Sequence, residues 1–516
     1  MVYIAGGLFM NVSNRNLINT LKVRVLDSST GNTVVAILNY KDASKLRLHR
    51  GDRIEIYLNK KNVVAIVDES ISDIKEGEIG LNFEASNHIK ANCGDLARIK
   101  PVVKPKSIYY IREKIEGKKL SEEKIKQIVS DIVTNRLSSV EITYFVSASY
   151  IRGLSLSETV SLTKAIYSYG EVLDFKKPRS SDILVDKHCI GGLAGNRTTP
   201  IIVPIVAASG LLIAKTSSRS ITSPAGTADV IEALCDVCLS KDQIISTVKK
   251  TGACMVWGGS LALAPADDEI IRVEHPLSID SDNQLVASVM AKKKSVSSDV
   301  VLIDIPIGPY AKVKNKFQAR KLKFLFEFVG KHIGIKTNVI YTDGRNPIGK
   351  GIGPSLEARD VLRIFENHED QPLDLRDKAL SMAGLLIEMG GKAKKGEGIN
   401  VARELLESGK ALNKFIEILK TQGERALCSN DIEIASYVKC LELKSEGRIK
   451  LIRNDYIAET AKVAGAPKDK LAGVYIRKQA GDLVKKGEVV IEIHSQSKHK
   501  LDSAVKFFNE HIPFVM

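Results

Sequence analysis

The chain has 516 residues, of which 44% are hydrophobic and 27% are charged, as in folded globular proteins rather than disordered ones. This length exceeds what a single hydrophobic core usually serves, so we expect roughly two to four domains. The 76 lysines and arginines outnumber the 61 aspartates and glutamates, which gives a formal net charge of +15. That excess favours anionic partners, either phosphorylated small molecules or nucleic acid, without choosing between them.

The cysteines predict a reducing compartment. There are seven, an odd number, and they are scattered along the chain, which argues against a disulfide framework. Cys235 and Cys238 form a lone CxxC among apolar residues, which we interpret as helix core rather than as a metal site. No charge-free stretch reaches the ~20 apolar residues that a membrane span needs. We therefore expect a cytoplasmic protein with no membrane partner.

The first hundred residues predict a β-rich domain. Short runs in which apolar and polar residues alternate are found at 21–27, 32–40, 52–59 and 61–70. The segment 101–106, rich in proline and lysine, then indicates a linker. From 121 to about 169 the apolar spacing becomes helical, with Ser121 as the expected N-cap of the first helix. This second region predicts a helical domain.

From residue 183 onward, predicted strands and helices alternate. Strands are expected at 183–188, 211–217 and 300–308, and helices at 203–210 and 226–235. Such alternation is typical of a mainly parallel sheet covered by helices. Near the end, 473–495 returns to short strands with turns at Gly481 and Gly487. The expected fold class is a multidomain α/β protein with an N-terminal β domain, a helical domain, a large α/β domain and a C-terminal α+β module.

The first of two loops that follow predicted strands covers 186–196 and carries groups that bind anions. Lys187 supplies a full positive charge, and His188 titrates near neutral pH. The glycines that follow, among them Gly191 and Gly192, let backbone N–H groups approach an anion closely, and the next helix begins soon after them. The pattern is neither the Walker motif nor GxGxxG, so it does not indicate a nucleoside triphosphate. The alternative is a tight turn that needs glycine.

The second loop, 215–229, combines Arg219 with a dense array of serine and threonine hydroxyls. The alternative here is a capped turn, with Thr227 or Asp229 as the cap of the following helix. If the strands before the two loops are neighbours in one parallel sheet, both loops lie at its carboxyl edge, where α/β proteins bind their ligands. This convergence favours a functional site over two unrelated turns.

Together the two loops resemble the paired signatures of the thymidine and pyrimidine-nucleoside phosphorylases. The SxR…GTxDxxE core of that family corresponds here to Ser217, Arg219, Gly226, Thr227, Asp229 and Glu232. Segments 263–270, 287–294 and 346–362 are also similar, so the resemblance covers roughly 105–516. The additional N-terminal β domain resembles the longer, type 2 branch of the family, which includes AMP phosphorylases.

The resemblance implies a pentosyltransferase that cleaves the N-glycosidic bond of a nucleoside with inorganic phosphate and uses no metal or organic cofactor. Thymidine is the first candidate substrate, giving thymine and 2-deoxyribose 1-phosphate. The alternative is AMP or another nucleoside 5′-monophosphate, giving a free base and ribose 1,5-bisphosphate. A homodimer is also implied. Outside this class, a basic RNA-binding protein is the rival, but aromatic residues make up only 5% of the chain, so no nucleic-acid partner is expected.

The resemblance also assigns roles to individual residues. Asp280 would donate a proton to the departing base, and His188 would lie near the base and the sugar. Phosphate would be held by Lys187, Gly192, Ser217 and Thr227. The nucleoside or nucleotide would be contacted by Ser218, Arg219, Ser220, Ile221, Thr222, Ser223, Ser288, Lys292 and Lys312. Lys292 lies in a run of three lysines, for which a solvated helix face is the alternative.

Three positions depart from the family pattern. Val273 stands at or beside the place of an arginine that reads the pyrimidine, and Arg272 is only adjacent. Cys189 replaces a serine that helps to bind phosphate in the shorter branch, and the pair 224–225, proline and alanine, replaces a stretch richer in glycine. These departures leave phosphorolysis as the expected reaction and leave the base open.

The patterns and the resemblance together divide the chain into four domains. The N-terminal β-rich domain is expected at 1–103, and the helical domain at 104–178 with a completing segment near 264–295. The phosphate-binding α/β domain is expected at 179–263 and 296–435, and the C-terminal α+β domain at 436–516.

Overall fold

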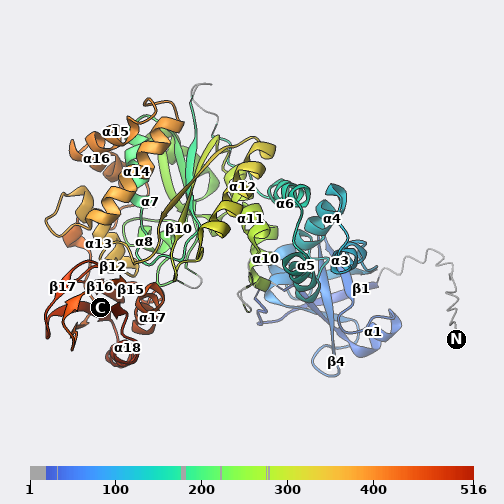
Figure 1. The fold of residues 1–516 in the computed structure, drawn as a ribbon. Helices are drawn as coiled ribbons and strands as arrows, with labels where there is room; N and C mark the ends of the chain where they lie inside the picture. The colour runs from blue at the N-terminus through green and yellow to red at the C-terminus, as the bar shows by residue number, and fades with distance from the viewer. Residues whose placement is uncertain are drawn as a thin grey trace, which may run out of the picture. The chain divides into compact units, whose positions relative to one another are not determined.

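The computed structural model describes residues 19–31, 33–175, 182–220, 223–274, 276, 279 and 281–516 (Figure 1). The chain forms two compact units, Met1–Ala165 with Ala266–Ser281 and Ile166–Pro265 with Asp282–Met516. It is a mixed α/β protein, as predicted. In the described part of the chain, every helix is too short or too polar to cross a membrane.

The smaller unit begins with a closed β-barrel of six strands, in the order β1-β5-β2-β4-β3-β6. The strands are β1 (Asn19–Val25), β2 (Val35–Asn39), β3 (Arg53–Leu58), β4 (Lys61–Ser70), β5 (Glu78–Leu81) and β6 (Leu96–Val102), with two short helices, α1 (Tyr40–Lys45) and α2 (Phe83–Ile89). Alternate residues such as Leu38, Ile54 and Ile79 fill the interior. The first four strands confirm the alternation in the sequence, whereas β6 continues through Pro101 into the segment interpreted as a linker.

Helices follow the barrel in the same unit. They are α3 (Ser107–Ile115), α4 (Glu122–Val133), α5 (Ser139–Arg152), α6 (Leu156–Ser168) and α10 (Pro265–Glu274). The Ser121 hydroxyl accepts a hydrogen bond from the Lys124 N–H and caps α4, as predicted. A buried ion pair of 2.8 Å between Lys114 Nζ and Glu158 Oε1 fastens α3 to α6.

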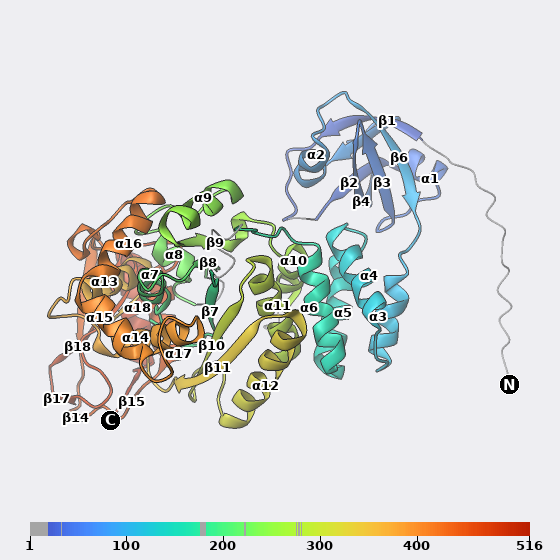
Figure 2. The ribbon, with the colours of Figure 1, turned by 90° about the horizontal axis from the view of Figure 1, so that it is seen from above.

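The larger unit is organised around parallel strands: β7 (Val185–Cys189), β8 (Ile213–Ser217), β9 (Ala253–Trp257), β10 (Val300–Ile307) and β11 (Lys336–Asp343). Pairing gives the orders β11-β10-β7 and β8-β9, and a parallel bridge between Leu184 and Leu212 joins β7 to β8 (Figure 2). The carboxyl ends of β7 and β8 therefore lie next to each other, which confirms the predicted arrangement of the two loops.

Helices cover both faces of these strands. They are α7 (Thr199–Ala208), α8 (Thr227–Ile231), α9 (Lys241–Thr251), α11 (Asp282–Ser295), α12 (Lys316–Ile333), α13 (Pro354–Phe365), α14 (Leu373–Met389), α15 (Gly398–Glu407) and α16 (Lys410–Thr421). On one face, Val185 and Ile213 pack in a core with residues of α7 and α14. On the other, Leu184 and Ala214 pack with residues of α9. The completing segment near 264–295 is divided, because α10 groups with the smaller unit and α11 with the larger one.

The C-terminal residues add an antiparallel sheet in the order β12-β16-β18-β13. The strands of this sheet are β12 (Gly351–Ile352), β13 (Tyr437–Glu442), β16 (Gly473–Ile476) and β18 (Val489–Ser495). The module also contains two short strand pairs, β14 (Gly447–Arg448) with β17 (Leu483–Val484) and β15 (Leu451–Ile452) with β19 (Phe514–Val515). Its helices are α17 (Asn454–Ala464) and α18 (Lys498–Glu510). Gly481 and Gly487 have φ values of +101° and +81°, which fits the turns predicted there. The edge strand β12 comes from the loop before α13, so this module is joined to the α/β domain by strand pairing.

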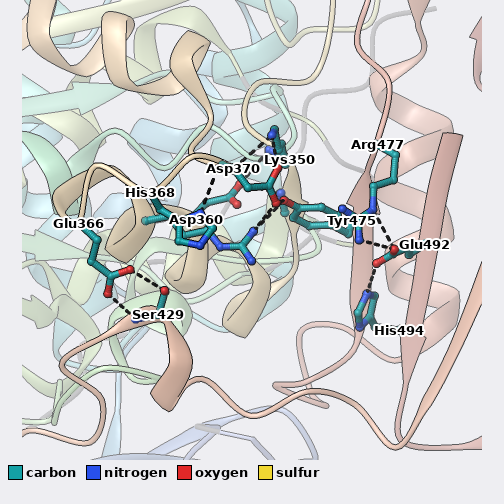
Figure 3. A network of polar contacts seen from close by, with 12 residues as sticks. Lys350, Asp360, Glu366, His368, Asp370, Ser429, Tyr475, Arg477, Glu492 and His494 are labelled. Carbon is teal, nitrogen blue, oxygen red and sulfur yellow. Dashed lines mark hydrogen bonds and ion pairs between the residues drawn. The ribbon is translucent and has the colours of Figure 1, made fainter. Parts of the chain in front are cut away.

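A buried polar network strengthens that joint (Figure 3). The Tyr475 hydroxyl donates a hydrogen bond of 2.6 Å to Asp370 Oδ2 and accepts one of 2.8 Å from Arg363 Nη1. Lys350 forms an ion pair with the same aspartate. The Arg359 guanidinium carbon lies 4.9 Å from the centre of the Tyr475 ring. The Tyr475 side chain on β16 is thus bonded to α13 and to the loop that follows it, and Lys350 joins the loop before α13 to the same aspartate.

Candidate active site

Lys187 lies on β7, near its carboxyl end. Its side chain is buried, with 2% exposure, and Nζ donates a hydrogen bond of 2.8 Å to Thr198 Oγ1. Burial lowers the pKa of Lys187 to about 8, the cations Lys378 and Arg197 add to this effect, and the carboxylate of Asp304 opposes it. Lys187 is therefore a cation at neutral pH that holds its proton less tightly than an ordinary lysine.

Two further buried lysines lie beside it. Lys293 Nζ is 2.7 Å from Asp186 Oδ2, and Lys215 Nζ is 3.9 Å from Asp186 Oδ1. Burial and the neighbouring Lys293 lower the pKa of Lys215 well below its usual value. Lys293 belongs to the run of three lysines that could also have been interpreted as a solvated helix face, but it is only 3% exposed. Lys215 and Lys293 thus share one carboxylate, and Lys187 adds a third buried ammonium group nearby, which makes this edge of the sheet attractive to anions.

The loop after β7 requires glycine. Gly191, Gly192 and Gly195 have φ values of +92°, +79° and +72°, in the left-handed region that disfavours other residues. A Cβ on Gly192 would lie 2.2 Å from the backbone nitrogen of Lys312, and one on Gly195 would lie 2.1 Å from the Ile348 carbonyl oxygen. The loop is therefore packed tightly against two other loops, and Gly192 and Lys312, both predicted site residues, are neighbours.

His188 is half-buried at the end of β7, and no hydrogen-bond partner of its ring is found among the described residues. Burial lowers its pKa well below the usual range, and the cations Lys293, Lys215, Lys187 and Lys292 lower it further. The ring is therefore neutral at pH 7 and available to a ligand as a hydrogen-bond donor or acceptor. Because Lys292 acts on His188 electrostatically, α11 brings Lys292 towards the end of β7, with Ser288 one helical turn away.

The loop after β8 is shaped by Asp229. Its Oδ2 accepts hydrogen bonds of 2.8 Å from the Ser220 N–H and 2.9 Å from the Gly226 N–H, which closes the loop. Ser217, at the end of β8, is half-buried, and its hydroxyl makes no hydrogen bond within the described residues. Thr227 begins α8 and is also half-buried. Two hydroxyls of the predicted phosphate site thus border the same edge as Lys187.

Arg219 is held by acidic residues of its own motif. Its Nη1 and Nη2 donate hydrogen bonds of 2.6 and 2.5 Å to the two oxygens of Glu232, and its guanidinium stacks on Trp257 at 4.9 Å. The bond to Arg219, together with Lys470, lowers the pKa of Glu232 to about 2. The charge of Arg219 is therefore already balanced within the protein.

The structure gathers most of the predicted site residues along one edge. The following predicted site residues lie on β7, on β8, on the segments that follow these strands, or next to these segments: Lys187, His188, Gly192, Ser217, Ser218, Arg219, Ser220, Ser223, Thr227, Ser288, Lys292 and Lys312. Ile221, Thr222 and Asp280 lie outside the described residues. Their roles remain predictions, and Asp280 is not placed relative to the lysines.

Sequence reasoning gave no role to several buried residues at this edge. Asp304 on β10 forms an ion pair of 3.0 Å with Lys378 and accepts a hydrogen bond of 2.6 Å from the Thr342 hydroxyl. Arg197 forms a buried ion pair of 2.5 Å with Glu357. The partners in these ion pairs are far apart in the sequence, so no local pattern indicates them.

Comparisons with known proteins agree with the resemblance. The family model described as "Glycosyl transferase family, helical bundle domain" matches 108–170, "Glycosyl transferase family, a/b domain" matches 181–281, and "Pyrimidine nucleoside phosphorylase C-terminal domain" matches 449–515. An AMP phosphorylase of Methanocaldococcus jannaschii is 42% identical over 94% of this chain and 95% of its own length. A "Putative thymidine phosphorylase" of Legionella pneumophila (strain Corby) is 43% identical over 88% of this chain and 86% of its own. The crystal structure of anthranilate phosphoribosyltransferase from Thermus thermophilus, 19% identical, covers 60% of this chain and 98% of its own with a TM-score of 0.51, which shows a shared fold.

Phosphate binding is expected to weaken as the pH rises above about 8, because Lys187 then loses the proton that gives it its charge. Calorimetric titration with inorganic phosphate at successive pH values should show a loss of affinity of up to about tenfold per pH unit above that point. In Lys187→Arg the guanidinium keeps its charge, so the affinity of that variant should change little over the same range. A Lys187→Arg variant whose affinity falls with pH just as the wild type's does would contradict the assignment.

Proposed function

This chain belongs to the glycosyl transferase family that contains the nucleoside phosphorylases and is a pentosyltransferase, and we propose that it cleaves thymidine with inorganic phosphate, giving thymine and 2-deoxyribose 1-phosphate. The observation that carries the proposal is the edge formed by β7 and β8, where Lys187 and two hydroxyls lie beside a surplus of buried positive charge. This edge suits a small oxyanion, and phosphate is the nucleophile that the reaction requires.

The reaction forms one bond and breaks another at the same carbon. A phosphate oxygen bonds to C1′ of the sugar, and the bond between C1′ and the base nitrogen breaks with its electron pair going to the base. The transition state resembles an oxocarbenium ion, so a phosphate held close to C1′ stabilises it. Lys187 would supply the charge that holds phosphate, and Ser217, Thr227 and the backbone beside Gly192 would supply neutral donors.

The departing base carries negative charge and needs a hydrogen-bond donor or a proton. The neutral ring of His188 has one N–H to offer, and Lys292 would add a cation on the same side. Asp280 stays in the proposal as the proton donor on the strength of the sequence match. In this arrangement the two ends of the reaction use different groups, with phosphate on Lys187 and the base near His188.

A nucleotide substrate is the second candidate, because the AMP phosphorylase of Methanocaldococcus jannaschii matches 94% of this chain. A 5′-phosphate needs a cation of its own, and the exposed Lys312 next to Gly192 is suitably placed to provide one. Arg219 favours the nucleoside instead, because Glu232 already balances its charge. A neutral 5′-hydroxyl fits such a hydroxyl-rich, charge-balanced loop better than a second phosphate does.

A homodimer is the assembly we propose, and α5 provides the surface. Val140, Tyr144 and Ile151 are 64%, 57% and 75% exposed. They recur at helical spacing along one side of α5, so they form an apolar stripe rather than scattered contacts. Covering this stripe with a second copy of the chain would remove it from water in a self-complementary, two-fold contact.

Phosphate-dependent release of thymine tests the reaction. Purified protein is incubated with thymidine, uridine, AMP, adenosine, CMP or UMP, with and without phosphate, and the free base is quantified by chromatography. We expect thymine only when phosphate is present, and a loss of kcat/KM of about 100-fold or more in Lys187→Met, because the charge on phosphate is then unbalanced. Lys331→Met, which removes an exposed lysine on α12, serves as the matched control and should behave like the wild type.

The substrate range decides between the candidates. Release of adenine from AMP but not from adenosine, without thymine release, would replace thymidine by a nucleotide. A base that is released at the same rate without phosphate would contradict phosphorolysis. A protein that releases a base from none of these substrates would contradict it as well.

Charged substitutions on α5 test the dimer. Tyr144→Glu combined with Ile151→Glu should convert a dimer to a monomer in sedimentation-velocity experiments, because two carboxylates in an apolar contact lose their hydration. Ile71→Glu, at a residue that is 77% exposed on another part of the same unit, is the control and should leave the dimer intact. A monomeric wild-type protein, or a double variant that still dimerises, would refute this surface.

A further inference from the structure

Arg197 connects three segments around the proposed phosphate site. It follows the glycine loop after β7, and its side chain is buried, with the whole residue 9% exposed. Nε donates a hydrogen bond of 2.5 Å to Glu357 Oε2, Nη1 one of 2.9 Å to Thr227 Oγ1, and Nη2 one of 3.0 Å to the Ala225 carbonyl oxygen. The guanidinium therefore ties the loops after both strands to α13 in a single rigid fork.

The bond to Thr227 determines what that hydroxyl can do. A threonine hydroxyl has one proton and two lone pairs. Arg197 has only protons to give, so it occupies a lone pair of Oγ1 and leaves the hydroxyl proton unused. Within the described residues, no acceptor for this proton lies at hydrogen-bond distance from Oγ1. Because Thr227 is half-buried, the proton is available to a ligand that accepts hydrogen bonds.

Arg197 is itself anchored from the opposite side. Glu357 is 1% exposed, and its Oε1 also accepts a hydrogen bond of 3.1 Å from the Gly353 N–H at the start of α13. The negative charge of this carboxylate balances the guanidinium, so Arg197 is poorly placed to act as a free cation for an anion. Its distinctive contact with the site is the single hydrogen bond to Thr227.

We propose that Arg197 is a positioning residue for phosphate: it holds the Thr227 hydroxyl so that this group donates its proton to a phosphate oxygen. The inference rests on the proposed function, since it takes phosphate as the ligand of this edge. It assigns the main effect of Arg197 on phosphate binding to its hydrogen bond with Thr227. Removing the guanidinium should therefore weaken phosphate binding and leave the nucleoside subsite unaffected.

A double-mutant cycle separates this role from a structural one. Arg197→Gln and Thr227→Val are made singly and together, and KM is measured for phosphate and for the nucleoside. Each single variant should raise KM for phosphate about tenfold, roughly the loss of one hydrogen bond to a charged group, and change KM for the nucleoside by less than about twofold. The double variant should be no worse than either single one. In Thr227→Ser, which keeps a hydroxyl, Arg197→Gln should still have its full effect.

Two further variants control for folding. Arg197→Gln leaves the buried carboxylate of Glu357 without its partner, so the cycle is repeated in Glu357→Gln, where Arg197→Gln no longer leaves a carboxylate unpaired. Arg363→Gln removes a different half-buried arginine, at the Tyr475 network, and should lower Tm without changing KM for phosphate. Effects of Arg197→Gln and Thr227→Val that multiply in the double variant would overturn the proposal, as would an Arg197→Gln variant altered only in Tm.

Direct binding keeps this test distinct from that of the reaction. The same variants are titrated calorimetrically with inorganic phosphate alone, which needs no turnover. If the wild type binds phosphate but releases no base, the proposed function fails and the cycle of binding constants still tests Arg197. If the wild type releases a base with phosphate, and the effects of Arg197→Gln and Thr227→Val on the free energy of phosphate binding add up in the double variant, only the role of Arg197 fails.

Discussion

The site depends on an imbalance of buried charge at the end of β7. Asp186 is the carboxylate nearest to Lys215 and Lys293, and Lys187 lies next to it in the same strand. Removing an ammonium group from water costs several kcal/mol unless it is paired, so such a surplus is expensive to maintain. The protein reduces that cost by lowering the proton affinity of Lys187 and Lys215, and the surplus of positive charge makes this edge attractive to an anion. Phosphorolysis needs such an edge, because its nucleophile is an anion.

The rest of the larger unit supports this edge from a distance. Lys470, in the C-terminal module, forms ion pairs of 2.7 Å with Glu232 and 3.3 Å with Asp229, the two acidic residues that hold the loop after β8. The Tyr475 network and the pairing of β12 with β16 fix that module to α13, which also carries Glu357. The module therefore contributes to the shape of the hydroxyl-rich loop even though it contains no predicted site residue.

The parts of the site that were predictable are those with a local cause. Gly192 is required by a positive φ and a close neighbour, and the place of Ser217 follows from the end of an apolar strand. The buried pairs were not predictable, because Arg197 and Glu357 are 160 residues apart and only the folded chain brings them together. Lys293 looked like part of a solvated lysine run, since the sequence does not show which side of α11 faces Asp186. In the barrel, β5 was missed because four residues are too few to show alternation.

The central claim is that phosphate itself attacks C1′, and labelled phosphate tests it most directly. The protein is incubated with thymidine and inorganic phosphate that carries ¹⁸O at all its oxygens, and the sugar phosphate formed is analysed by mass spectrometry. Attack by phosphate predicts a 2-deoxyribose phosphate that retains every labelled oxygen, including the one now bonded to C1′, in an amount equal to the thymine released. Thymine released together with an unphosphorylated sugar, while the labelled phosphate stays unconsumed, would show hydrolysis and contradict the account.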